Sequence, residues 1–395
     1  MGRFLRRARR RATVVAVDPL ARAHERLQTW LLEHAYEVWW SRGADRLRGG
    51  YHERLRLDAT PTDEPRRTRV QVRQIFAYSR ASALGWRGPA VAAVNHGLEF
   101  FLSRYARTDH LFRALVAPDG APLDERAVLY DQAFALLGLA SAFEVLGEAR
   151  LRTTARGLHD RLRAQLAHAG GGFEESAPRS RPLSANSHMH LLEASLAWIE
   201  LDEGPRWMTL AAEIVELALT RWIDPRSGAL REFFGADWQP TSGRLGRIVE
   251  PGHQFEWAWL LLRYGARAKD ARLAAAALRL IEIGETHGVD PARGVAMNAL
   301  LDDMSVLDGE ARLWPQTERI KAACIAAEVT GEARYSRAAS QATETLTRYL
   351  DVPVRGLWRD RMNLAGVFIE EPVPASSFYH IVGAVAELGR LARVV

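Results

Sequence analysis

The chain has 395 residues, of which 48% are hydrophobic, and a single cysteine, Cys324. One cysteine excludes an intramolecular disulfide and a cysteine-based metal site, and it favours a reducing, cytoplasmic location. The arginine-rich residues 1–18 can account for the whole formal net charge of +5, and we interpret them as a disordered basic extension. Residues 19–395 are then near neutral, which argues against a nucleic-acid-binding protein. No apolar run approaches the roughly 18 residues of a membrane span.

Apolar residues recur at intervals of three and four along nearly the whole chain, as in LQTWLLEHAYEVWW, and this spacing predicts helices. We predict twelve of them, at residues 20–42, 66–87, 89–106, 124–147, 149–167, 185–201, 204–223, 250–268, 270–287, 307–330, 332–350 and 373–392.

The connections between these helices alternate in length. Those after the even-numbered helices are short, for example LGEA and VTGEA, whereas those after the odd-numbered helices are long and rich in Gly, Pro and Asp. Some long connections contain short alternating segments, which predict small hairpins. The repeating unit is therefore a pair of antiparallel helices of roughly 60 residues.

Repeated helix pairs either stack into an open solenoid or close into a ring. In a solenoid the unusual polar residues would spread over a concave face, whereas in a closed barrel they would gather at one mouth. In this chain they stand at the starts of the even-numbered helices, all at the same end of their hairpins. We therefore predict that residues 19–395 form one all-α (α/α)6 barrel, with the even-numbered helices inside.

The first turn of each even-numbered helix carries polar or aromatic side chains that suit the binding of a small polar molecule. Each has a simpler explanation, because a lone His on an apolar face is usually a core residue, and Asn186 could be an N-cap. Recurrence at one level in six successive hairpins favours a functional cluster instead. Its members are Arg73; Tyr130, Asp131 and Gln132; Asn186, His190 and Glu193; His253 and Glu256; Trp314, Gln316 and Glu318; and Ser377 and His380.

Metal and phosphate motifs find little support in the sequence. His188 and His190 are two residues apart, so on a helix their side chains diverge and shared coordination is unfavourable. The HExxH pattern is absent, and the glycine-rich GGGFEE lacks the Lys and Ser or Thr of a P-loop.

Six ordered motifs resemble the N-acylglucosamine 2-epimerase superfamily and, within it, the D-mannose isomerase-like aldose–ketose isomerases. They are RVQVRQ, YDQAF, NSHMHLLEA, EPGHQFEWAWLL, WPQTERIKA and PASSFYHI, and the resemblance covers nearly the whole chain after the basic extension. It implies an (α/α)6 barrel, in agreement with the helix count. It also implies catalytic roles for Arg73, His253, Glu256 and His380, and a sugar-binding role for His190.

Sugar isomerisation removes the proton alpha to a carbonyl and returns it at the neighbouring carbon, through a cis-enediolate. Histidine is a base near neutrality, and Arg73 stays charged and can stabilise the developing oxyanion. We expect His380 to move the proton between C2 and C1, because no carboxylate stands at helical spacing from it and its pKa would stay near about 6.5. We expect His253 to open the sugar ring. We expect Glu256 to accept a hydrogen bond from the imidazole N–H of His253 and so to fix its tautomer.

We predict an isomerase that interconverts D-mannose, or a related aldose, and D-fructose. The alternatives are a sugar 2-epimerase, a mannose-6-phosphate isomerase with Arg359 and Arg361 at the phosphate, and a sugar-binding or hydrolytic protein, which would need paired carboxylates. We expect no metal, no cofactor, a monosaccharide as partner, and neither nucleic acid nor membrane; a homodimer is compatible with the sequence, which leaves the oligomeric state open. The predicted sugar-binding residues are His190, Asn186, Glu318, Trp314, Asp131 and Tyr130.

Overall fold

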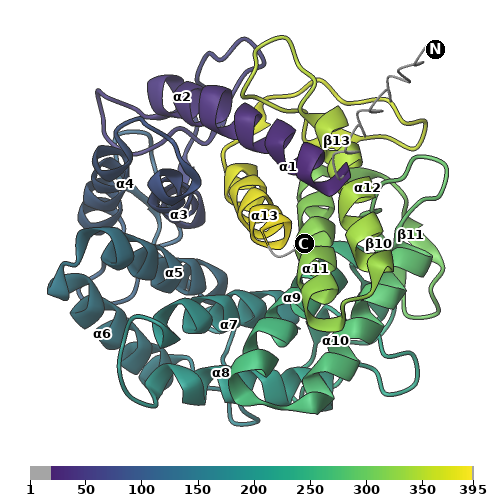
Figure 1. Cartoon of the computed structure of the whole chain (residues 1–395). Helices are drawn as coiled ribbons and strands as arrows, with labels where there is room; N and C mark the ends of the chain where they lie inside the picture. Colours follow the sequence, from purple (N-terminus) through teal and green to yellow (C-terminus); the bar gives the residue numbers. More distant parts are fainter. Residues whose placement is uncertain (1–18, 394–395) are drawn as a thin grey trace, which may run out of the picture.

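The structure is a computed structural model that describes residues 19–393, so the predicted basic extension lies outside the described residues. Six helices form an inner ring (Figure 1), in which each helix packs against the next and the last packs against the first. These inner helices are α3 (Thr68–Leu84), α5 (Leu129–Leu146), α7 (Ala185–Ile199), α9 (Pro251–Ala268), α11 (Leu313–Thr330) and α13 (Ser376–Ala392).

The remaining helices form an outer ring, so the predicted (α/α)6 barrel is confirmed. The inner helices α3 to α13 correspond to the second, fourth, sixth, eighth, tenth and twelfth of the predicted helices. The outer segments are α1 (Pro19–Trp30) with η1 (Leu31–Ala35), α2 (Tyr36–Val38) and η2 (Trp39–Gly43); α4 (Ala90–Arg104); α6 (Ala149–Gln165); α8 (Arg206–Leu217) with η3 (Ala218–Trp222); α10 (Ala271–Ile283) with η5 (Gly284–Gly288); and α12 (Ala333–Tyr349).

Short antiparallel strands join the long connections at one end of the barrel. Each long connection pairs with the next one, and the sixth pairs with the first, so the strands link the connections into a second closed ring. Only β3–β4 and β10–β11 are hairpins within one connection, as the sequence predicted. The strands are β1 (Arg54–Leu55), β2 (Arg66–Arg67), β3 (Leu115–Val116), β4 (Pro122–Asp124), β5 (Ala127–Val128), β6 (Ser176–Ala177), β7 (Leu183–Ser184), β8 (Phe233–Phe234), β9 (Ile248–Val249), which follows η4 (Leu245–Arg247), β10 (Ala299–Leu301), β11 (Val306–Asp308), β12 (Ala311–Arg312), β13 (Arg361–Met362) and β14 (Val373–Pro374).

A repeated glutamine attaches the long connections to the inner helices. The fourth residue of α3, α5, α9 and α11 is a fully buried glutamine, and its amide accepts from the N–H and donates to the C=O of one residue in the preceding connection. Buried backbone groups need such partners, so the amides fix the connections on the barrel. The glutamines are Gln71, Gln132, Gln254 and Gln316, and they bind Tyr51, Phe112, Leu230 and Ala296 respectively.

His188 takes the place of this glutamine in α7. Its Nε2 accepts from the N–H of Phe173 at 3.0 Å, and its Nδ1–H donates to the C=O of Ser184 at 3.0 Å. Burial lowers the pKa of His188 to about 4, so the ring is neutral and can accept at one nitrogen. Both ring nitrogens serve the fold, which explains the HMH sequence without a metal.

The short turns after the inner helices depend on glycine. Gly85, Gly147 and Gly331 follow α3, α5 and α11 with φ of 106°, 66° and 70°, a conformation that favours glycine because it has no Cβ. Each turn lets the next outer helix start within a few residues.

Helix α5 is long and apolar enough to cross a membrane by length and composition alone. In the barrel, 72% of that helix is buried. A helix packed on several sides inside a protein has the same composition, so this apolar character is accounted for by its place in the inner ring.

Replacing Gln132 by Met keeps the side-chain size but leaves the buried N–H and C=O of Phe112 without their partner. We expect the free energy of unfolding to fall by about 2 kcal/mol or more, measured by urea denaturation. The matched control is Gln341→Met on the exposed side of α12, which should change it by less than about 0.5 kcal/mol. Equal stabilities of the two variants would contradict the clamping role.

Candidate active site

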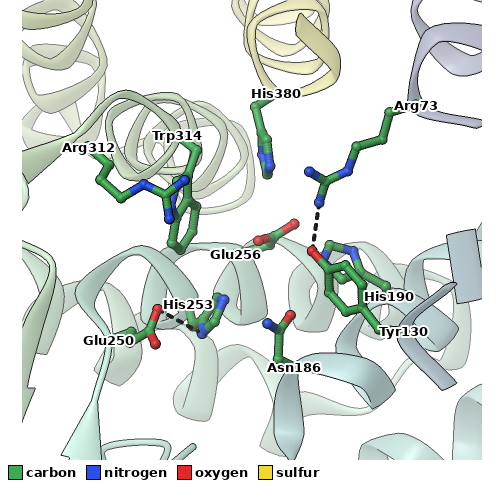
Figure 2. A pocket seen from close by; sticks show the side chains of 10 residues that line it. All are labelled: Arg73, Tyr130, Asn186, His190, Glu250, His253, Glu256, Arg312, Trp314 and His380. Carbon is green, nitrogen blue, oxygen red and sulfur yellow. Dashed lines mark hydrogen bonds and ion pairs between the residues drawn. The ribbon is translucent and has the colours of Figure 1, made fainter. Parts of the chain in front are cut away.

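A polar cavity of ≈ 240 Å³ lies at the barrel mouth, where the first turns of the inner helices meet. In Figure 2 the side chains that line it point into a common space from six inner-helix starts and the segments before them. The lining residues are Arg73, Tyr130, Asn186, His190, Glu250, His253, Glu256, Arg312, Trp314 and His380.

The structure thus gathers eight of the ten predicted site residues around one cavity. Asp131 and Glu318 do not line it. Asp131 is buried and paired with Arg69 at 3.2 Å, so it lies beside the first turn of α3 rather than in the cavity. Glu318 is also fully buried, and it lies behind His380.

Arg73 presents a cation to the cavity. Its Nη2 donates to the hydroxyl of Tyr130 at 2.7 Å, and its guanidinium lies 4.2 Å from the centre of the Phe134 ring. Its Nε is buried without a hydrogen-bond partner among the described residues. The charge is held in place by aromatic groups, so it is available to an anion that forms in the cavity.

His253 is held by two carboxylates, and neither is the predicted one. Its Nδ1 donates to Glu232 at 2.9 Å. It also lies 3.5 Å from Glu250, and Figure 2 marks this second pair. The expectation that Glu256 accepts this N–H is wrong, because Glu232 reaches the ring from the connection before α9. Burial opposes protonation, but Glu232 and Glu250 outweigh it and raise the pKa of His253 to about 10.

His380 has the opposite environment. Its Nδ1 donates to Glu318 at 2.8 Å, although the sequence suggested no carboxylate neighbour, because Glu318 reaches it from α11 across the helix interface. Burial, with the nearby charges of Arg73 and Lys321, lowers the pKa of His380 well below its usual range, so a value near 6.5 was also a wrong expectation. The neutral ring therefore carries its proton on Nδ1 and leaves Nε2 free to accept.

His190 is a second neutral histidine on the cavity wall. Its Nδ1 donates to Glu193 at 3.0 Å, and the hydroxyl of Tyr379 donates to the other oxygen of Glu193. Burial lowers the pKa of His190 to about 4, while the bonds from His190 and Tyr379 overcome burial and lower the pKa of Glu193 to about 2. His190 can therefore accept a hydrogen bond from a ligand through Nε2.

Besides Arg73, two cavity residues have buried polar atoms without partners among the described residues: both carboxyl oxygens of Glu256 and the amide oxygen of Asn186. Burial and the neighbouring Glu318 raise the pKa of Glu256 well above its usual value, so we expect a neutral acid that can both donate and accept. Unpaired buried groups are costly, and a ligand rich in hydroxyls would satisfy them.

Trp314 lies between the two cavity histidines. Its ring centre is 5.0 Å from that of His253 and 5.7 Å from that of His380. The indole therefore supplies an apolar face within a polar cavity. Trp257, by contrast, is fully buried against Trp222 and belongs to the core.

Three groups of carboxylates and histidines are close enough to hold a metal ion: Glu232, Glu250 and His253; Glu256, Glu318 and His380; and His190, Glu193 and Glu256. Protonation of His253 blocks the first group. Lys321 lies 2.6 Å from Glu318 and supplies a cation to the second. In the third group, Nδ1–H of His190 already donates to Glu193. Cations and hydrogen bonds within the protein therefore account for all three groups.

Sequence reasoning missed Glu232, Glu250 and Arg312 as site residues. Glu250 directly precedes α9, in the motif that contains His253, and Arg312 directly precedes α11, two residues before Trp314. Their position one residue before an inner helix was a usable signal. Glu232 lies in the middle of a long connection, and nothing in its neighbourhood indicates that it returns to the cavity.

Comparison with known proteins agrees with this geometry. The family of N-acylglucosamine 2-epimerase (GlcNAc 2-epimerase) matches residues 49–384. The chain is 47% identical over 369 residues to a mannose-6-phosphate isomerase of Rhizobium meliloti (strain 1021), covering 92% of this chain and 95% of that protein. It is 29% identical over 313 residues to a D-mannose isomerase of Thermobifida fusca, covering 69% and 75%. A crystal structure of a D-mannose isomerase matches with a TM-score of 0.85 at 20% identity, covering 96% and 100%.

The closed (α/α)6 barrel and the family match place the chain in the class of sugar isomerases and epimerases. The family match extends over most of the chain. The protein belongs to the N-acylglucosamine 2-epimerase family and is an isomerase of that group.

The protonation of His253 can be tested without any substrate. Its pKa in the folded state, about 10, lies above the unfolded value of about 6.5, so the stability it contributes is fully present below pH ~6.5 and is lost as the pH rises through ~10. Glu232→Gln removes the nearest carboxylate and should lower this pKa and reduce the loss of stability between pH ~6 and ~10. The measurements are NMR titration of the ring and urea denaturation at both pH values.

The control for this experiment is Glu203→Gln, an exposed carboxylate in the turn before α8, which should change neither quantity. Titration of His253 near pH ~6.5 in the unaltered protein would contradict the assignment.

Proposed function

We propose that the protein interconverts D-mannose, or a closely related aldose, and D-fructose through a cis-enediolate. The observation that carries the proposal is the opposite protonation of two histidines on one cavity. His253, beside two carboxylates, is a cation that can give a proton, and His380 is a neutral base. Groups whose pKa values are driven apart in one site divide acid and base work between them.

The first step is opening of the sugar ring. The His253 imidazolium gives its proton to the ring oxygen as the bond from that oxygen to C1 breaks. Glu250 lines the same part of the cavity, and burial, opposed by His253, raises its pKa to about 7. Its carboxylate can take the proton of the C1 hydroxyl, so the two residues together release the open-chain aldehyde.

The second step moves a proton between carbons. Nε2 of His380 takes the proton from C2, and the electrons of that bond form the C1–C2 double bond as negative charge develops on O1. Arg73 stabilises this oxyanion, because its cation is fixed by Tyr130 and lies in a largely buried site. His380 then returns the proton to C1.

A second proton must pass from O2 to O1 to complete the ketose. A neutral carboxylic acid can give a proton to O1 through one oxygen and accept the proton of O2 through the other. Glu256 has two unpartnered oxygens at the cavity and a raised pKa, so we assign it this role. Asn186, His190 and Trp314 are then left to hold the remaining hydroxyls and an apolar face of the sugar.

A 2-epimerase could use the same groups, with His253 returning the proton to the opposite face of C2. We favour the isomerase because the relatives at 47% and 29% identity are both named isomerases. The products distinguish the two outcomes, since mannose gives fructose in one and glucose in the other.

A phosphorylated substrate is the second candidate, because the relative at 47% identity is named a mannose-6-phosphate isomerase. The predicted phosphate ligands are engaged elsewhere: Arg359 pairs with Glu370 at 2.9 Å and Arg361 with Glu371 at 2.7 Å, and neither lines the cavity. Arg312 does line it and lies 3.5 Å from Asp360, so it is the cation that a phosphate would meet. Parallel assays with mannose and mannose 6-phosphate decide between these substrates.

The same proposal includes a monosaccharide as the partner of the site and a cytoplasmic location. The small volume of the cavity agrees with the first, and the single buried cysteine, Cys324, agrees with the second.

The division of labour between the histidines can be tested with mannose in heavy water, followed by NMR. His380→Asn should lower exchange of the C2 proton by about 10³-fold, because the base is lost. His253→Asn should slow turnover but leave measurable exchange, since some open-chain sugar forms spontaneously. The control His287→Asn replaces an exposed histidine and should retain full activity. Retained exchange in His380→Asn with loss in His253→Asn would reverse the roles.

We also expect prolonged treatment with a chelator to leave the rate unchanged, because protons and Lys321 occupy the positions that a metal would need. The measurement is the initial rate before and after dialysis against EDTA. Loss of activity that one particular divalent ion restores would contradict this expectation.

A further inference from the structure

Lys321 is a buried cation that the proposed reaction does not use. It stands one turn after Glu318 on α11 and is 2% exposed. Its ammonium lies 2.6 Å from the second oxygen of Glu318 and 3.8 Å from the centre of the Trp259 ring. A buried lysine is costly unless a carboxylate and an aromatic face replace its water, so its presence in the barrel needs an explanation.

The contacts form a chain of three residues. Lys321 binds one oxygen of Glu318, and the other oxygen accepts from Nδ1 of His380 at 2.8 Å. His380 is the only one of the three that lines the cavity. Lys321 therefore reaches the reacting base through one intervening carboxylate.

The charge balance around Glu318 makes the lysine important. Lys321 faces carboxyl groups on four inner helices: Glu318 on its own helix, Glu256 on α9, Glu193 on α7 and Glu387 on α13. Arg263 lines the same pocket as Lys321, and the charges of Arg73 and Lys321 both act on the neutral ring of His380. Burial raises the pKa of Glu318 above its ordinary value, and the charge of Lys321 is the largest influence that opposes this rise. Without the lysine, Glu318 would be a buried acid among other acids.

We propose that Lys321 is a positioning residue that keeps Glu318 ionised and thereby holds His380 in the tautomer with its proton on Nδ1 and a bare Nε2 facing the substrate. An ionised carboxylate can only accept, so it fixes the proton on Nδ1. A protonated Glu318 would instead donate to Nδ1 and place the ring proton on Nε2, where it would block proton abstraction from carbon.

The direct test is the ¹⁵N NMR spectrum of the histidine rings in the labelled full-length protein, with the His380 signals assigned from their absence in His380→Asn. In the unaltered protein we expect Nδ1 protonated and Nε2 free. Lys321→Met keeps the length and apolar stem of the side chain but removes its charge, and we expect it to move the proton to Nε2. The kcat for mannose should fall by on the order of 10²-fold, while KM should change by less than about 3-fold.

The matched control is Arg319→Met, two residues before Lys321 on the same helix. It removes the ion pair of a buried arginine with Glu285 at 2.6 Å, and this side chain bonds to neither Glu318 nor His380. We expect a lower Tm with unchanged kcat and an unchanged His380 tautomer, so a general loss of stability is separated from a positioning effect.

Glu318→Gln gives an independent measurement if Lys321→Met does not fold. Its amide would donate to Nδ1, so the same tautomer change is expected, and the double variant should be no slower than Glu318→Gln alone.

An Nε2-protonated ring in the unaltered protein, or an unchanged tautomer in a folded variant of either residue, would overturn the proposal. The effect on turnover rests on the proposed function, but the tautomer does not. Absence of conversion of any aldose, with the expected tautomer change, would therefore refute the function alone.

Discussion

The barrel mouth depends on one requirement: the backbone groups of the long connections are buried there and must find hydrogen-bond partners. Glutamines at the fourth position of the inner helices meet this need in four repeats, and His188 meets it in a fifth. The paired strands satisfy further groups and tie successive connections together. The cavity side chains belong to the same first turns, so the requirement that fixes the loops also fixes the chemistry.

The second determinant is the distribution of carboxylates around the cavity. Burial alone would make both His253 and His380 neutral, because a charged ring loses its water. Two carboxylates, Glu232 and Glu250, reverse this for His253, whereas the carboxylate at His380 has its charge balanced by Lys321. The same side-chain type thus acquires two protonation states within one cavity.

The sequence was sufficient for the barrel because two periodicities agree: the helical repeat and the alternation of connection lengths. The predicted first residue of an inner helix was less exact where a strand directly precedes that helix. The helices predicted from 124 and 307 begin at Leu129 and Leu313, since β5 and β12 occupy the residues before them and two apolar residues cannot distinguish a strand from a helix. Eight of the ten predicted site residues lie around one cavity at the barrel mouth, because the alternation of connection lengths places the starts of the inner helices at one end of the barrel.

The partners of the histidines could not be predicted in this way. Spacing along one helix pointed to Glu256 as the partner of His253 and to none for His380, but both rings are held from other elements. Glu232 comes from an irregular connection, and Glu318 comes from a neighbouring helix 62 residues away in sequence. Such contacts depend on how far each connection extends over the mouth and how neighbouring helices are rotated, and neither is encoded in local periodicity. In the same way, Gln132 and Gln316 were recognised by position, although their backbone partners lie 20 residues earlier.

Closure of the strand ring has a consequence for synthesis of the chain. The pair β1–β14 joins residues near 54 to residues near 373, and Gln74 donates to the backbone of Ala375, 301 residues later. These contacts join residues that are very far apart in the sequence. The entropic cost of closing so long a loop can be offset only when the last repeat is present to form the contacts. During translation the first five helix pairs can associate with their neighbours, but α3 and the first long connection lack their partners from the last repeat until α13 has emerged from the ribosome. The helix that completes the ring also carries His380, so a nascent chain acquires its base and its closed shape in the same event.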